Sequence, residues 1–395
     1  MTATPDVTLQ PPQKRLKIAV LNRIFSPTGG GAERYSIALV EQLAARHEIH
    51  VFAQQRNHDW PGVTYHKVSA PLPKPRWVNQ LWYAAATWWA TRRGFDVVHS
   101  HENTWHGQVQ TMHVMPVKYN LFHGRAGISR VLRWIKVVAS PRLLVYLLFE
   151  RARLAGDPQR HRVIVASATL QNIFETTYPH VARAPAVITP GVKPVAPPDP
   201  AQKNAARATL GLPQTGACIL FVGHDYRKKG LEVLLNALAR LPSETWLAVV
   251  GNPAQIPVFR DQANRLGVAS RVFFLGSLTD VSQAYVAADL LAHPTLEDTF
   301  AMVVLEAMAH GLPVVVSDAQ HCGISALLDN NANALILNDL KDAQELSDLL
   351  RCLIEDAPLR QRLGSAAAAF AQAHQWPAIA RQQEAIYASV CGAVD

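Results

Sequence analysis

Short apolar runs alternate with helical patterns along most of the chain. Runs that are apolar throughout predict strands buried on both faces, and helices between such strands predict parallel sheets. The runs of the first half are KIAVLN (17–22), EIHVFA (48–53), DVVHSH (96–101), VQTMHV (109–114) and RVIVAS (162–167). Those of the second half are CILFVG (218–223), WLAVVG (246–251), VFFLG (272–276), DLLAHP (289–294), PVVVSD (313–318) and ANALIL (332–337).

The chain is predicted to form two domains. Its 395 residues are enough for two α/β domains. The proline-rich stretch PGVKPVAPPDPAQK (190–203) predicts a linker without a helix or inner strand. We therefore expect two doubly wound, Rossmann-like α/β domains facing a cleft, over 16–192 and 193–372. Residues 373–395 hold an amphipathic helix that either crosses back to the first domain or packs on the second.

The loops that leave these strands carry the chemistry, because open parallel sheets bind ligands beyond the carboxyl ends of their strands. After 289–294, Asp298 or Thr299 is expected to cap a helix, leaving N–H groups near Phe300, Ala301 and Met302 free for an anion. Glu306 follows about 12 Å further on if all eight steps are helical, which suits an elongated ligand. Alternatively, Asp298 is only a cap and Glu306 only a solvated helix residue.

Two more loops point to phosphate. Arg227, Lys228 and Lys229 lie between Gly223 and Gly230, where a strand ends and a helix begins, and this basic cluster suits a diphosphate unless it is a solvated turn. A triplet of glycines (29–31) follows the first strand and permits close approach of the backbone to a ligand. Neither loop has the spacing of a Walker A or a dinucleotide-binding motif.

Composition narrows the class of protein only slightly. The net charge of +8 is compatible with nucleic acid, an anionic membrane or a phosphorylated substrate. The four cysteines form no C-x-x-C pair, which favours a reduced, cytosolic protein. The N-terminus has no apolar signal core, and no apolar stretch reaches the roughly 20 residues of a membrane span.

Together, the GGAERY, GHDYRKKG and EDTFAMVVLEAM stretches resemble the family-4 glycosyltransferases of the GT-B fold, which are nucleotide-sugar enzymes that retain anomeric configuration. GHDYRKKG and its surroundings look most like those of bacterial lipopolysaccharide core glucosyltransferases. The resemblance implies an acceptor-binding first domain and a nucleotide-sugar-binding second domain. It is strongest from Phe221 to Leu337 and thins between about 70 and 160.

The resemblance also assigns roles to residues. In the family, an E-x7-E motif grips the donor sugar with its first acid and the ribose with its second. Here the second acid is Glu306, and the first is Asp298 with Glu297 beside it, so either of the two can reach the sugar. His224 stands where the family often has an arginine, and Lys228 or Arg227 can supply that charge. His113 matches the histidine that faces the donor sugar, with His101 as second candidate.

The loops and the resemblance thus give a full set of expected site residues. Those expected in catalysis are His113, Asp298 and Lys229. Those expected to bind substrates are Gly30, Gly31, His101, His224, Arg227, Lys228, Glu297, Phe300, Ala301, Met302 and Glu306. For both histidines, a strand-end histidine satisfied by the backbone is the alternative.

Neither a metal nor another cofactor is expected. His99, His101, His106 and His113 lie in one stretch, but without H-E-x-x-H spacing or an acid partner, and the chain has no D-x-D. Lysines and helix-start N–H groups can neutralise a leaving diphosphate instead. Because no covalent nucleophile is evident, a front-face reaction is expected, in which the leaving phosphate helps deprotonate the acceptor hydroxyl.

Two amphipathic segments suggest the acceptor. PKPRWVNQLWYAAATWWATRR (73–93) and GISRVLRWIKVVASPRLLVYLLFERAR (127–153) combine apolar stripes with flanking Arg and Lys. They either lie at an anionic membrane surface or pack on the first sheet. The first reading predicts a cytoplasmic, peripheral enzyme at the inner face of the bacterial inner membrane. The resemblance, whose lipopolysaccharide-core subfamily has lipid-linked acceptors, implies that the enzyme moves a hexose from a UDP-sugar, or a GDP-sugar, to a lipid-linked saccharide such as the lipopolysaccharide core.

Three other functions remain open on the sequence. A sugar-nucleotide epimerase of the same fold needs no acceptor, and a transferase for a soluble acceptor needs no membrane. A lectin-like module would bind sugar without releasing nucleotide. A nucleic-acid partner is not expected, because no stacking motif or recognised module is present.

Overall fold

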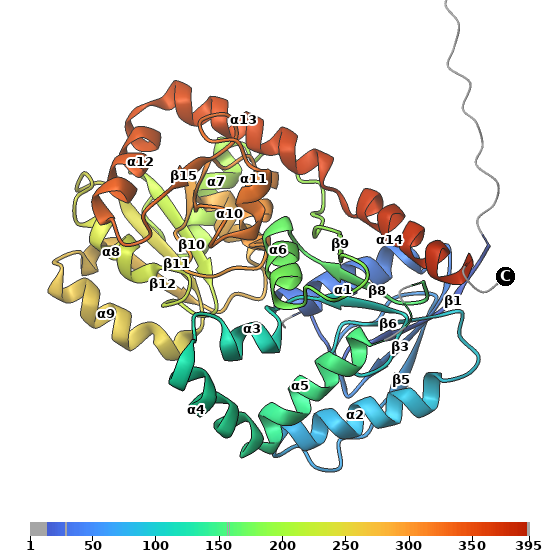
Figure 1. Ribbon diagram of the computed structural model, residues 1–395. Helices are drawn as coiled ribbons and strands as arrows, with labels where there is room; N and C mark the ends of the chain where they lie inside the picture. Colours follow the sequence, from blue (N-terminus) through green and yellow to red (C-terminus); the bar gives the residue numbers. More distant parts are fainter. Residues whose placement is uncertain (1–13, 28–29, 156, 158, 393–395) are drawn as a thin grey trace, which may run out of the picture. The chain divides into compact units, whose positions relative to one another are not determined.

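The computed structural model describes residues 14–27, 30–155, 157 and 159–392 (Figure 1). The described residues form two compact units. The first unit takes those within Met1–Gln110, Lys136–Arg162 and Ala385–Asp395, and the second those within Thr111–Ile135 and Val163–Glu384. The domain boundaries expected at 192/193 and 372/373 stay a prediction.

One parallel sheet has the strand order β5-β3-β1-β6-β7-β8-β9. Its strands are β1 (Lys17–Leu21), β3 (Glu48–Ala53), β5 (Val63–Lys67), β6 (Val97–Ser100), β7 (Val109–Met112), β8 (Arg162–Val165) and β9 (Ala186–Val187). A short parallel pair, β2 (Ile24–Phe25) and β4 (Gln55–Arg56), lies beside it in the first unit. The inner strands β1 and β3 are almost completely buried, as their continuous apolar runs predict.

The other parallel sheet lies within the second unit and has the order β12-β11-β10-β13-β14-β15. Its strands are β10 (Cys218–Gly223), β11 (Trp246–Gly251), β12 (Val272–Gly276), β13 (Leu290–His293), β14 (Val314–Ser317) and β15 (Leu335–Leu337). The order reverses direction at β10, whose neighbours are β11 and β13. In a doubly wound sheet such a switch point is where loops on the two sides part and leave room for a ligand.

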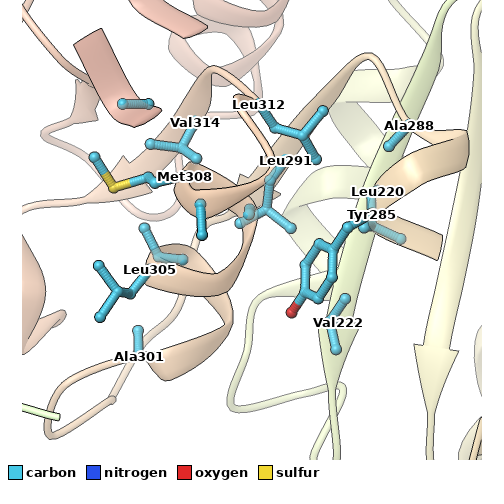
Figure 2. Packing of buried hydrophobic residues seen from close by; sticks show 14 of the residues in the cluster. Leu220, Val222, Tyr285, Ala288, Leu291, Ala301, Leu305, Met308, Leu312 and Val314 are labelled. Atoms are coloured by element: carbon cyan, nitrogen blue, oxygen red, sulfur yellow. The ribbon is translucent and has the colours of Figure 1, made fainter. Parts of the chain in front are cut away.

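Alternation along β10 divides the core of the second unit into two clusters, because successive strand residues point to opposite faces. Leu220 and Val222 belong to one cluster, shown in Figure 2 with Tyr285 and Leu305. Phe221 belongs to the other, with residues of α8 and α12. The helices α8 and α9 lie on one side of strands β10–β12, and α7, α10 and α11 on the other (Figure 1).

The remaining elements are helices. In the first unit they are α1 (Gly31–Leu43), α2 (Arg76–Thr91) and α5 (Pro141–Leu154), while α4 (Gly127–Val138) and α14 (Trp376–Cys391) carry residues of both units. In the second unit they are α3 (Val117–Phe122), α6 (Ala168–Thr177), α7 (Pro200–Thr209), α8 (Leu231–Leu238), α9 (Ile256–Arg265), α10 (Ser282–Ala287), α11 (Met302–Ala309), α12 (Ala343–Glu355) and α13 (Ala357–Ala373). Within the described chain, none is long and apolar enough to cross a bilayer.

The predicted fold class is confirmed: both domains are Rossmann-like, with parallel sheets covered by helices. The expectation that 190–203 holds no helix is wrong from Pro200 onward, because α7 begins there. Proline is accepted at the first helical position, and Asp199 and Gln202 form a reciprocal capping box around it. The strand β5 was not predicted, because its VTYHK sequence is polar and partly exposed, as an edge strand can be.

The C-terminal helix has a buried side, as its amphipathic pattern predicts. Trp376 packs on Gly191 in the second unit. Further along α14, the Tyr387 hydroxyl lies 2.7 Å from His99 Nδ1 in the first unit, and both side chains are fully buried. The expected crossing between domains stays a prediction.

Candidate active site

The loop that leaves β10 brings Lys229 to the carboxyl edge of the second sheet. The Lys229 amide donates to Asp225 O at 2.9 Å, and the Lys229 side chain passes over Gly223, where an added Cβ would lie 2.9 Å from Lys229 Cγ. Gly230 has φ +80°, and a Cβ there would lie 1.9 Å from Pro294 O. Gly230 is therefore required for the loops after β10 and β13 to touch, whereas an added Cβ at Gly223 would meet only the flexible Lys229 side chain of the same loop.

The ammonium group of Lys229 contacts the loop that follows β13. Its Nζ donates to Asp298 Oδ2 at 2.6 Å and to Glu297 O at 3.0 Å. His293 Nε2 lies 3.2 Å from the same Asp298 oxygen, and His293 is fully buried. Burial raises the pKa of Asp298, but the His293 hydrogen bond and the Lys229 charge outweigh it and hold that pKa well below its usual range.

The second carboxylate oxygen of Asp298 accepts hydrogen bonds from the backbone just before α11. Oδ1 accepts from Ala301 N at 2.9 Å and from Phe300 N at 3.3 Å. The expectation that these amides are free for an anion is therefore corrected, because the neighbouring carboxylate already occupies them. For Met302, the first residue of α11, the structure shows no such bond to Asp298 within the described chain. That these three residues bind substrate stays a prediction.

Glu306 lies on α11, and fewer helical steps separate it from Asp298 than the sequence pattern implied. Ala301 has φ +72°, a left-handed conformation, and α11 begins only at Met302. Half of the eight steps between the two acids are therefore not helical, and the all-helical separation does not apply. The Glu306 carboxylate accepts from the Tyr285 hydroxyl at 2.8 Å, and Figure 2 shows this tyrosine in the cluster beside β10.

The outer part of the site is charged and open to solvent. His224, Arg227 and Lys228 are exposed. Lys228 Nζ lies 3.4 Å from Glu297 Oε1, with 58% and 44% of the two side chains exposed. An ion pair this exposed contributes little to stability, so both groups can exchange it for a ligand.

His113 is joined to this site within the second unit. The Thr299 hydroxyl donates to His113 O at 2.9 Å, which fixes the exit of β7 on the loop that carries Asp298. Burial lowers the pKa of His113 to about 4. Its imidazole is therefore neutral at pH 7 and can offer a hydrogen bond without adding charge.

The remaining candidates lie in the first unit. Gly30 and Gly31 form the start of α1, whereas Gly29 lies outside the described residues. The His101 amide donates to Leu21 O at 3.0 Å, and its ring centroid lies 4.3 Å from that of His99. In the first unit, the two glycines thus stand at the start of α1, and His101 follows directly after β6.

Sequence reasoning missed two residues of the site. His293 lies inside the apolar run predicted as a strand, and Tyr285 carries no predicted role, yet they contact Asp298 and Glu306. A signal for His293 was present, since a histidine that ends a buried strand just before a catalytic loop needs a polar partner. No local signal marked Tyr285, whose partner lies 21 positions away.

Solved structures share this architecture. WaaG, a glycosyltransferase involved in lipopolysaccharide biosynthesis, matches with a TM-score of 0.79 and 22% identity over 94% of this chain and 99% of that one. Sucrose-phosphate synthase from Thermosynechococcus elongatus matches with a TM-score of 0.74 and 24% identity over 96% and 100%. HepE from Anabaena, solved with UDP-glucose, gives 0.73 and 21% over 95% and 100%. The fold is that of GT-B glycosyltransferases.

Family models identify the chain further. The Glycosyltransferase Family 4 model matches residues 29–195, and the Glycosyl transferases group 1 model matches residues 202–370. The two models together take in most of the sequence, and the chain belongs to the group 1, family-4 glycosyltransferases. The resemblance expected from the loop motifs is confirmed.

Curated relatives match over part of the chain. The lipopolysaccharide glucosyltransferase WaaG of Escherichia coli is 30% identical over 223 residues, which are 54% of this chain and 58% of the relative. The D-inositol 3-phosphate glycosyltransferase of Corynebacterium diphtheriae is 32% identical over 215 residues, 51% of this chain and 50% of the relative. The chain thus spans about half the length of these curated relatives.

Proposed function

We propose that this glycosyltransferase moves a hexose, with retention of configuration, from a nucleotide-sugar to a saccharide acceptor. The observation that carries the proposal is the Lys229 ammonium, fixed between Asp298 and Glu297 O at the switch point of the second sheet. The exposed Arg227 and Lys228 beside it supply further positive charge for a diphosphate. A UDP-sugar is favoured, with HepE crystallised with UDP-glucose as support, and a GDP-sugar is the other donor considered.

The reaction demands stabilisation of a leaving diphosphate. The bond between the anomeric carbon and the phosphate oxygen breaks, and the acceptor oxygen bonds to the same face of that carbon. The acceptor proton passes to the leaving phosphate oxygen. Lys229 and Lys228 stabilise the charge that develops there, which is the largest electrostatic demand of the step. His113 positions the sugar, and Glu306 holds the ribose.

The contacts of Asp298, the first acid of the motif, indicate its role. Both oxygens of Asp298 are engaged, by Lys229 and His293 on one side and by two amides on the other. We therefore assign Asp298 the task of positioning Lys229. Among the described residues, the Glu297 carboxylate has only an exposed lysine beside it, so it is the better placed of the two acids to exchange its partner for a sugar hydroxyl.

The acceptor is proposed to be lipid-linked, because α4 presents a continuous apolar face to solvent. Its members are Ile128, Val131, Leu132, Ile135 and Val138, at spacings of three and four residues, and each is at least 59% exposed. The opposite side of the helix is held in place: Arg133 Nε donates to Leu121 O at 3.2 Å, and Val137 is fully buried. A helix packed only on its own domain would turn this apolar face inward.

The helix α2 supports the same conclusion. Its buried positions are Gln80, Tyr83, Ala84, Thr87 and Thr91. Its tryptophans Trp82, Trp88 and Trp89 are exposed instead, and the Arg92 guanidinium lies 3.5 Å from the Trp89 ring centroid. Tryptophans and arginines on one helix surface suit the interface of a bilayer. We propose a cytoplasmic enzyme, peripheral to the inner membrane, acting on a saccharide such as the lipopolysaccharide core, as the 30% identity to WaaG supports.

The donor is tested by thermal unfolding with UDP-, GDP- and ADP-sugars, because a ligand of the folded state raises the melting temperature. One nucleotide class is expected to stabilise the wild type and to lose this effect in Lys229→Ala. Nucleotide release that requires an acceptor supports a transferase. Epimerisation of the donor alone, or sugar binding without nucleotide release, would contradict the proposal.

A further inference from the structure

A cavity of about 310 Å³ lies in the first unit at the carboxyl ends of β3 and β5. These strands pair in parallel, with Phe52 opposite His66 and Ala53 opposite Lys67. The residues that line the cavity are Val51, Ala53, Gln54, Arg56, Tyr65, His66 and Lys67. None of them belongs to the donor site, and the volume lies at the small end of ligand pockets, which run from roughly 300 to 1,000 Å³.

Two cations reach this cavity from different strands. Lys67 ends β5, is exposed, and has no partner for its ammonium among the described residues. Arg56 of β4 donates to Asp59 through Nη1 at 2.8 Å, but the Asp59 side chain is 75% exposed and the pair is therefore weak. The Arg56 Nη2 and Nε atoms show no partner in the described chain, so one edge of the guanidinium remains available.

The walls around these cations are held in place. The Tyr65 hydroxyl accepts from Trp60 N at 3.0 Å, and its ring lies 4.5 Å from the Arg56 guanidinium. Gln54 Nε2 donates to Ser69 O at 3.0 Å, and its amide pairs with that of Asn79. Stacking on Tyr65 orients the guanidinium and reduces the entropy that a ligand would cost on binding.

Among the described residues that line the cavity there is no acid, and the carboxylate nearest to its cations is the exposed Asp59, which pairs with Arg56 from outside the lining. Burial and the neighbouring His50 lower the pKa of His66, which disfavours a further positive charge on its ring. The cavity lining therefore carries the Lys67 charge and the weakly paired Arg56 charge, beside a tyrosine and small apolar residues. Arginine binds phosphate in a bidentate manner, and lysine adds a point charge to the same anion.

We propose that this cavity binds a phosphate monoester, carried by a phosphorylated saccharide. The Arg56 guanidinium and the Lys67 ammonium hold the phosphate. The exposed indole of Trp60, next to Tyr65 through its backbone, offers a surface for the sugar ring. This site shares no residue with the donor site around Lys229, and its anion binding does not depend on the proposed function.

The test is calorimetric titration of the full chain with glucose 6-phosphate, inorganic phosphate and glucose. We expect glucose 6-phosphate to bind, inorganic phosphate to bind more weakly, and glucose not to bind measurably. Arg56→Gln and Lys67→Gln should each weaken binding at least about tenfold, because each removes a charge-assisted contact. Both side chains are exposed or partly exposed, so the melting temperatures should remain those of the wild type.

Two further variants locate the binding. Lys341→Gln removes an exposed lysine of the second unit as a matched control, and Lys229→Ala removes the donor-site cation. Both are expected to bind glucose 6-phosphate as the wild type does. Binding that survives Arg56→Gln combined with Lys67→Gln, binding lost only in Lys229→Ala, or no binding by the wild type would overturn the proposal. Equal affinity for glucose 6-phosphate and inorganic phosphate would show that the cavity does not recognise the sugar, and would contradict the saccharide part of the proposal. Donor stabilisation in the Arg56 and Lys67 variants is expected to persist, so failure here is distinguishable from failure of the proposed function.

Discussion

At the residue scale, Asp298 organises the site. It takes the ammonium of Lys229 and the imidazole of His293 on one oxygen and two amides on the other. Sequence patterns could locate Lys229 and Asp298, because both lie in loops at the ends of unmistakable apolar strands. They could not show that these two residues bind each other, since 69 positions separate them and only the order of strands brings their loops together.

The two neighbouring acids should respond differently to neutralisation. Asp298→Asn removes the partner of a largely buried ammonium and is expected to destabilise the fold by roughly 1–3 kcal/mol and to cripple transfer. Glu297→Gln is expected to keep stability within about 0.5 kcal/mol, since its ion pair is exposed, while lowering kcat/KM. Denaturant unfolding and initial rates provide the two readouts. Full transfer and full stability in Asp298→Asn would refute its positioning role.

The contact between the β10 and β13 loops depends on one glycine. In Gly230→Ala, the new Cβ meets Pro294 O and the backbone keeps φ +80°, so a loss of about 2–4 kcal/mol is expected. Gly211→Ala is the matched control, because Gly211 has φ +65° with nothing within 4 Å of an added Cβ, and should cost only about 1 kcal/mol. Unfolding curves measure both. Equal losses would show that φ alone, and not the loop contact, requires Gly230.

At the element scale, continuous apolar runs predicted the buried strands correctly, whereas short and edge strands were not predicted. Every predicted strand is present within a few residues of its run, because burial on both faces leaves a continuous signal. The strands β2, β4, β5 and β9 were missed, since short or edge strands need no such run. For α4 and α2, the helical stripes were visible in sequence, but only the structure shows that the apolar side of α4 and the tryptophans of α2 face solvent.

The exposed face of α4 gives a prediction about membranes. The wild type is expected to co-sediment with vesicles containing anionic lipid at low salt and less so at high salt, because each nearby cation contributes about 1 kcal/mol. Leu132→Glu should reduce this binding strongly. Val258→Glu, at a 55% exposed position of α9, is the matched control and should have little effect. No binding at low salt, with efficient transfer to a soluble saccharide, would refute the membrane part and leave the transferase proposal intact.

At the scale of the whole molecule, fold and family were predictable because they rest on features spread along the chain. The alternation of strands and helices predicts two Rossmann-like domains, and three loop motifs at strand exits predict the glycosyltransferase family. The identity of the acceptor is harder to predict from the sequence. The resemblance thins between about 70 and 160, where α2, α4 and α5 lie and where relatives with different acceptors are free to differ.

The most direct test of the central claim is the rate at which Lys229 variants transfer sugar from the donor that stabilises the wild type. Lys229→Ala is expected to lower kcat/KM by about 10²-fold or more, because it removes the fixed charge at the leaving diphosphate. Lys341→Ala, at an exposed lysine that is not among the proposed site residues, should transfer at the wild-type rate. Unchanged melting temperature without ligand would show that the loss is not unfolding. A folded Lys229→Ala variant with normal transfer and normal donor affinity would contradict the account.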